Sequence, residues 1–156
     1  ASALALVPGD WRLSIAGDGP ARAEVEAAFA PLAPRVTFLG QLDQPALAAL
    51  YAQGWLYLWP GHAEAYGLAA LEAQAAGLPV ISEATAGVPE VVKDGETGIL
   101  TPEHDPSAYT SAITALAFDP PRRAKMAQAA RHFAADERGL DAAARRLDTL
   151  LREIRP

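Results

Sequence analysis

The sequence predicts an α/β fold: a doubly wound parallel sheet with helices on both faces and a helical C-terminal tail. Three observations indicate this class. Short β-prone apolar runs alternate with helix-length segments from residue 11 to residue 105. The runs are continuously apolar, which is typical of parallel strands buried on both faces. The 156 residues, 51% hydrophobic and 21% charged, are enough for one globular domain with its own core.

The alternation assigns each element. Strands are expected at 11–17, 35–40, 55–60, 78–83 and 97–102. Helices are expected at 20–32, 44–54 and 66–77, with one or two helical turns at 88–95. From Pro106 to about residue 155 the pattern is helical, with breaks near 119–121 and at 138–139. Pro20 suits a first helical turn and Gly77 a helix end. Trp55 and Trp59 flank the third strand, and we expect both in the core.

Composition and charge exclude several classes of function. The chain has no cysteine, so it forms no disulfides or thiolate metal sites, and we read it as cytoplasmic. Residues 1–105 carry 4 basic and 13 acidic residues, a net charge of −9. Residues 106–156 carry 9 basic and 6 acidic residues, a net charge of +3. The acidic part argues against nucleic-acid binding, which needs clustered Lys and Arg.

Ligands of doubly wound sheets bind outside the carboxyl ends of the strands. Polar loops follow three of the expected strands, at 17–20, 40–41 and 61–64. These loops should therefore gather at one edge of the sheet and form a binding site. His62, in the third loop, has two readings: a general base, or an ordinary histidine at the rim of the site.

The helix after the third loop carries the main candidate site. It follows Glu64 and begins at Tyr66 or Gly67, so its first N–H groups have no partner within the helix. With the helix dipole, these groups attract an anion, typically a phosphate. Gly67 has no side chain, so a ligand can approach the backbone closely. The candidate anion-binding groups are the N–H groups of Tyr66, Gly67, Leu68 and Ala69.

Two carboxylates flank this point. Glu64 precedes the helix, and Glu72 lies on it, beside an expected buried stripe of Leu68, Leu71 and Ala75. Carboxylates accept hydrogen bonds from hydroxyls, so a ligand with a phosphate centre and polyol ends fits the layout. A sugar nucleotide is such a ligand, with Glu64 facing the sugar and Glu72 the ribose. The alternative stays open that both acids are ordinary helix residues, favoured by the dipole and by helix propensity.

From Glu64 to Gly77 the chain reads EAYGLAALEAQAAG, and it is flanked by LSIAGDGP, VTFLG and GLPVISEATAGVPEVVKDGETGILTP. In order and spacing, residues 11–133 closely resemble the C-terminal, donor-binding half of GT-B glycosyltransferases of family 4, whose fold is Rossmann-like. The resemblance implies a retaining, metal-independent transferase of the hexosyltransferase type, which uses a nucleotide diphosphate sugar as donor and needs no cofactor.

The resemblance also implies roles for individual residues. Glu64 contacts the donor sugar and is the candidate catalytic residue, and Glu72 binds the ribose. The backbone from Ala65 to Ala69 holds sugar oxygens and phosphate. The backbone of Gly40 and Gln41 borders the base. The chain has no Asp-x-Asp, the metal clamp of the other large glycosyltransferase fold.

The sequence also departs from the family. An Arg and a Lys that grip the diphosphate should follow a strand that lies before Trp11, and that strand and both residues are absent. We therefore expect a single domain, residues 1–156, that lacks its first strand, is inactive alone and needs an N-terminal acceptor domain. The basic C-terminal helices could contact either of two partners. One is that N-terminal domain, and the other is an anionic membrane surface at the inner membrane face. Two other functions stay open: a sugar-nucleotide epimerase of the same fold, and a degenerate, non-catalytic binding module.

Overall fold

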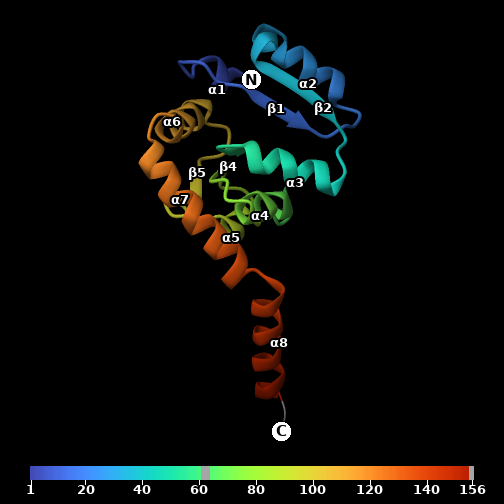
Figure 1. The fold of residues 1–156 in the computed structure, drawn as a ribbon, viewed down its shortest axis with the longest axis vertical. Coiled ribbons are helices and arrows are strands. Elements are labelled where there is room, and N and C mark those ends of the chain that lie inside the picture. The colour runs from blue at the N-terminus through green and yellow to red at the C-terminus, as the bar shows by residue number, and fades with distance from the viewer. Residues whose placement is uncertain (61–63, 155–156) are drawn as a thin grey trace.

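The computed structural model describes residues 1–60 and 64–154. Within these residues, the strands form two parallel sheets (Figure 1). The first pairs β1 (Leu13–Ala16) with β2 (Val36–Gly40), and the second has the order β3-β4-β5. The remaining strands are β3 (Tyr57–Trp59), β4 (Val80–Glu83) and β5 (Gly98–Thr101). The helices are α1 (Ser2–Ala5), α2 (Arg22–Phe29), α3 (Gln44–Gln53), α4 (Leu68–Ala75), α5 (Val88–Val91), α6 (Pro106–Ala117), α7 (Pro120–His132) and α8 (Leu140–Ile154), with a 3₁₀ segment η1 (Ala30–Arg35) and a π-helical segment η2 (Phe133–Glu137).

Side-chain caps set where several helices begin. Asp43, Asp105 and Asp119 each precede a helix, and each accepts a hydrogen bond of 2.9 Å from a backbone N–H of the first turn. The predicted breaks in the C-terminal helical region are confirmed, because α7 begins at Pro120 and α8 at Leu140. The short helix α1 was not predicted, since four residues are too few to show a period.

Strand β4 divides the core, and all four of its residues are buried. Ile81 packs on one side with Leu4, Ile113 and Leu116, which come from α1 and α6. Val80 packs on the other side with Ala70 of α4, with Val88 and Val91 of α5, and with Val92 directly after α5. Helices therefore cover both faces of this sheet, and the predicted fold class is confirmed.

The prediction that every strand is buried on both faces was wrong for β1 and β2. Their residues alternate between half-buried and exposed along each strand. Phe38 faces inward and meets Phe29 of α2 edge to face, with ring centroids 6.3 Å apart. Leu39 points outward and is 37% exposed. Helix α2 and segment η1 cover one face of this small sheet, so apolar residues on its other face remain at the surface.

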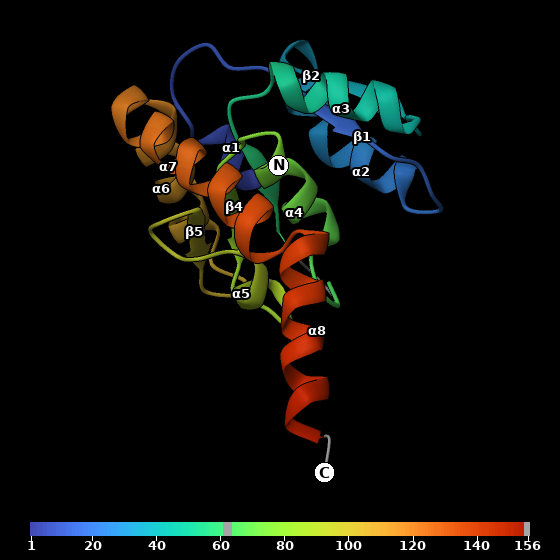
Figure 2. The same ribbon diagram turned by 60° about the horizontal axis from the view of Figure 1, so that its bottom comes forward.

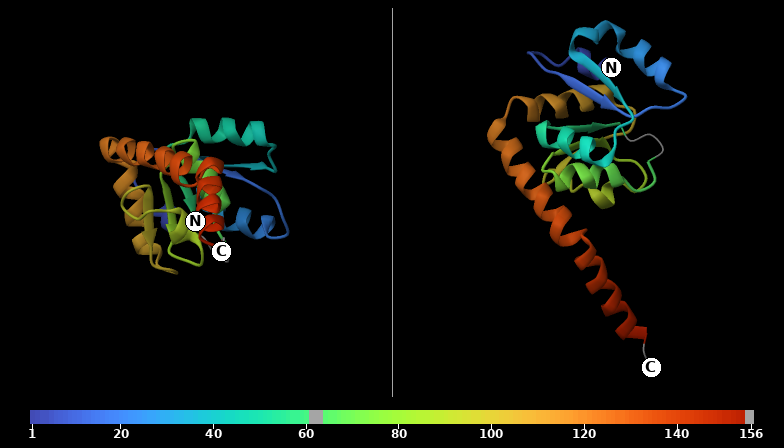
Figure 3. Two further views of the ribbon diagram at one scale, coloured as in Figure 1. Left: turned by 90° about the horizontal axis from the view of Figure 1, so that it is seen from below. Right: turned by 45° about the vertical axis from the view of Figure 1, so that its right-hand side comes forward.

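Helix α8 projects away from both sheets (Figures 1 and 3). One side of it carries apolar residues at helical spacing that remain exposed: Leu140, Leu147, Leu150, Leu151 and Ile154. None of the helices in the described ranges is long and apolar enough to cross a membrane.

Candidate functional site

The loop before α4 is closed by its own carboxylate. Glu64 Oε1 accepts the N–H of Gly67 at 2.9 Å and that of Tyr66 at 3.4 Å. Within α4, the N–H of Leu71 donates to the carbonyl of Gly67 at 3.1 Å. The N–H groups of Leu68 and Ala69 thus precede the helical ladder and point out of the helix start. Glu64 therefore sits where an anion would sit, and it holds two of the predicted anion-binding N–H groups.

Gly67 is needed for two reasons beyond the approach of a ligand. Its φ is +90°, in the left-handed region that glycine adopts without strain. A Cβ placed on it would lie 2.7 Å from Val91 Cγ2, which is closer than atoms can pack. Behind the same loop, a Cβ on Gly87 would lie 3.0 Å from Tyr66 Cα. The two glycines let α5 press directly against the loop that carries Glu64.

We expect Gly67→Ala to lower the free energy of unfolding by about 2–4 kcal/mol, from backbone strain and from overlap with Val91. Gly95→Ala is the matched control, because Gly95 also has a positive φ (+75°) but open space around its Cβ position. It should lose only about 1–2 kcal/mol. Urea unfolding of this chain, followed by circular dichroism, measures both values. Equal losses would show that the contact with Val91 costs nothing.

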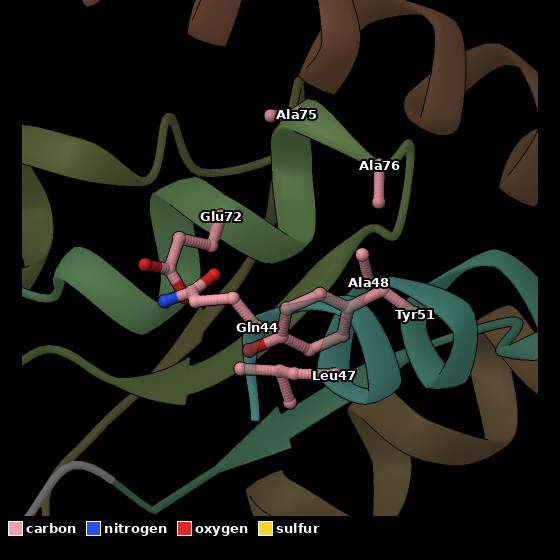
Figure 4. Close-up of a pocket in the computed structure, with 7 residues that line it drawn as sticks. All are labelled: Gln44, Leu47, Ala48, Tyr51, Glu72, Ala75 and Ala76. Atoms are coloured by element: carbon pink, nitrogen blue, oxygen red, sulfur yellow. The ribbon is translucent and has the colours of Figure 1, made fainter. Parts of the chain in front are cut away.

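Glu72 lies in a cleft of about 290 Å³ between α3 and α4. In Figure 4 the side chains of Glu72 and Gln44 end near each other, and the ring of Tyr51 lies beside them. The residues lining the cleft are Gln44, Leu47, Ala48, Tyr51, Glu72, Ala75 and Ala76. The cleft has polar groups at one end and an apolar wall formed by α3.

The sequence interpretation missed the α3 side of this cleft. Its four α3 residues follow an i, i+3, i+4, i+7 spacing, which marks one face of a helix and was visible in the sequence. The interpretation instead singled out Gly40 and Gln41, which lie just before α3. Gly40 accepts the N–H of Gly17 at 2.7 Å, so the loops after β1 and β2 meet there.

Both carboxylates act on the tyrosines beneath the site. Burial, and then the charge of Glu72, raises the pKa of Tyr51. Burial raises the pKa of Tyr57 more strongly, and the nearby Tyr51, Glu64 and Glu72 raise it further. The rings of Tyr51 and Tyr57 meet edge to face at 6.0 Å. Tyr57 thus lies within the electrostatic reach of both acids.

The predicted buried stripe of α4 was wrong. Leu68 is 65% exposed and Ala75 is exposed, while Leu71 is half-buried. The buried residues are Ala70, Ala73 and Gln74. Helix α4 contacts α5, α7 and η2, and it lies beside α7 in Figure 2. Small side chains allow this close approach, and the larger Leu68 stays at the surface.

His62 lies outside the described residues. Among residues 1–60 and 64–154, no three His, Cys, Asp or Glu side chains are grouped closely enough to hold a metal ion.

Comparisons with known proteins connect this geometry to a family. The model of the family described as Glycosyl transferases group 1 matches residues 2–133. A D-inositol 3-phosphate glycosyltransferase from Thermomonospora curvata is 39% identical over 117 residues, 73% of this chain and 27% of that protein. A protein of the same name from Streptomyces coelicolor is 40% identical over 119 residues, 76% of this chain and 26% of that protein. The chain thus spans about a quarter of the length of these relatives.

Solved structures give the same picture of the fold. Sucrose-phosphate synthase from Thermosynechococcus elongatus superposes with a TM-score of 0.85 at 31% identity, over 98% of this chain and 40% of that one. HepE from Anabaena, solved in complex with UDP and glucose, superposes with a TM-score of 0.84 at 24% identity, over 97% of this chain and 43% of that one.

Proposed function

The chain belongs to the Glycosyl transferases group 1 family, and from this we propose that it is the donor-binding part of a longer glycosyltransferase. In that protein it binds a nucleotide diphosphate sugar for transfer to an acceptor. The proposal extends to a family 4 enzyme of the GT-B fold and hexosyltransferase type, which retains the anomeric configuration and acts in the cytoplasm. The observation that carries it is the start of α4, with one carboxylate before it and another in the cleft beside it.

The diphosphate would take the N–H groups at the start of α4. Leu68 and Ala69 offer theirs, and the helix dipole favours the negative charge. Tyr66 and Gly67 now donate to Glu64. When the donor enters, Glu64 would turn from these amides to the sugar hydroxyls, and the freed amides would bind sugar oxygens or phosphate.

The backbone from Ala65 to Ala69 would form this cradle. It would supply a preorganised positive field as the diphosphate leaves, so that neither a metal ion nor a cofactor is required. Glu72 would accept the ribose hydroxyls at the mouth of its cleft. The backbone of Gly40 and Gln41 would border the base.

We also propose that the chain lacks the first strand of its domain. β1 pairs only with β2, and β3 only with β4, within the residues that the structure describes. A further parallel strand between β1 and β3 would join the two sheets into one. The loop after this strand would bring the Arg and Lys that grip the diphosphate, so this chain alone should be inactive.

The acceptor domain of the longer protein is the proposed partner of this chain. The exposed apolar side of α8 supports this assignment, because isolated helices of this kind are stabilised by packing. Peripheral contact with an anionic membrane at its inner face is the alternative use of the basic C-terminal helices.

The test uses the longer protein, a labelled nucleotide sugar, an acceptor and EDTA. We expect the label to appear in a glycoside with the anomeric configuration of the donor. This chain alone, assayed in parallel, should form no product. Epimerised nucleotide sugar without any transfer would overturn the assignment in favour of an epimerase. Absence of both products over a panel of acceptors and donor bases would indicate a non-catalytic binding module.

A further inference from the structure

Gln74 is a polar side chain buried on the inner face of α4. It is the next-to-last residue of α4 and is completely buried. Its Nε2 donates to the carbonyl of Val91 at 2.7 Å and to that of Ala70 at 3.2 Å. Its Oε1 is buried without a hydrogen-bond partner among the described residues. A methionine would fill the same space with no unsatisfied oxygen, so packing alone does not account for a glutamine here.

The hydrogen bond to Val91 joins two helices. Val91 is the last residue of α5, and its side chain packs on Gly67 so closely that a Cβ on Gly67 would overlap it. Gly87, at the other end of α5, lies against Ala65 and Tyr66. Helix α5 is therefore the wall behind the loop that carries Glu64, and Gln74 ties this wall to α4.

The outer side of α5 has separate anchors. Arg138 donates to the carbonyl of Glu90, and Lys93 pairs with Glu137 at 2.7 Å. These contacts join the α5 region to η2, at the surface. They would keep α5 on the protein if Gln74 were replaced, whereas Gln74 makes the direct side-chain hydrogen bond from α4 to α5.

We propose that Gln74 is a positioning residue of the donor site. Its amide sets the distance between α5 and α4, and through Val91 it holds Gly67 where its N–H meets Glu64. The inference rests on the proposed function for the nature of the ligand. The positioning itself can be tested with no ligand present.

Hydrogen exchange of the ¹⁵N-labelled chain, read by NMR, tests the positioning. Gln74→Met should speed exchange at the N–H groups of Gly67 and Val92 at least 10-fold beyond any change in global stability. Tyr109→Phe is the matched control, since it also removes a buried hydrogen bond, from the Tyr109 hydroxyl to the carbonyl of Ile81 at 3.0 Å, among the α1 and α6 side chains. In this control, the exchange rates of both N–H groups should stay within about twofold of their wild-type values. If both N–H groups exchanged no faster in Gln74→Met than in Tyr109→Phe, the proposal would be overturned.

Val91→Ala covers the case in which Gln74→Met does not fold. It removes the contact with Gly67 but keeps the carbonyl that Gln74 binds. Exchange at Gly67 should accelerate at least fivefold, and unchanged exchange there would overturn the proposal. In the longer protein, Gln74→Met should raise the donor KM about 10-fold with kcat within threefold, and Tyr109→Phe should not. An unchanged donor KM in Gln74→Met would contradict the positioning role. If the wild-type longer protein transferred no sugar, that would contradict the proposed function instead.

Discussion

Glu64→Gln in the longer protein is expected to lower kcat/KM about 10- to 100-fold. Replacing the carboxylate with an amide would remove the charge-assisted hydrogen bonds that we propose to the sugar hydroxyls, each of which contributes about 1.5–3 kcal/mol. The amide keeps an oxygen that can accept the N–H of Gly67, now 2.9 Å from Glu64 Oε1, so the loop should keep its conformation. Steady-state kinetics with the donor varied measure the effect.

Two further variants separate chemistry from folding. Glu64→Ala also removes the acceptor of the Gly67 N–H, so it should lower the free energy of unfolding by about 1 kcal/mol as well. Glu26→Gln is the surface control, because Glu26 pairs with Arg22 on the exposed side of α2. It should leave the kinetics unchanged. Turnover of Glu64→Gln at the wild-type rate would remove Glu64 from the reaction.

The isolated chain is expected to bind the donor about 10²- to 10⁴-fold more weakly than the longer protein. The proposed function places an Arg and a Lys, on a strand and loop outside this chain, on the diphosphate. Two charged contacts of about 1.5–3 kcal/mol each amount to about 3–6 kcal/mol. Calorimetric titrations of both proteins with UDP, GDP and ADP measure the difference and identify the base. Equal affinities would mean that this chain holds the whole donor site.

The order of elements could be predicted because local signals mark it. Capping side chains such as Asp43 and Asp119, and glycines such as Gly77, fix where helices begin and end. The two acids and Gly67 could also be found, because they fall in one short motif. The spacing of these three residues along the sequence already places them relative to the start of α4.

What could not be predicted depends on tertiary neighbours. Trp55 and Trp59 were expected in the core, but they are 70% and 41% exposed. Trp55 instead lies under the Arg123 guanidinium, 4.9 Å from the ring centroid. Which face of α4 is buried depends on how closely α5 and α7 approach α4. The sequence of α4 alone does not determine these distances. Nor does it reveal that Glu64 accepts the N–H groups of Tyr66 and Gly67, or that Gln74 reaches Val91.

The most direct test of the account is a crystal structure of the longer protein with a non-hydrolysable donor analogue. We predict a phosphate oxygen within hydrogen-bonding distance of the N–H groups of Leu68 and Ala69. Glu64 should have turned away from Gly67 to the sugar, and Glu72 should accept a ribose hydroxyl. A diphosphate bound away from the start of α4, with Glu64 still on the N–H of Gly67, would contradict the account.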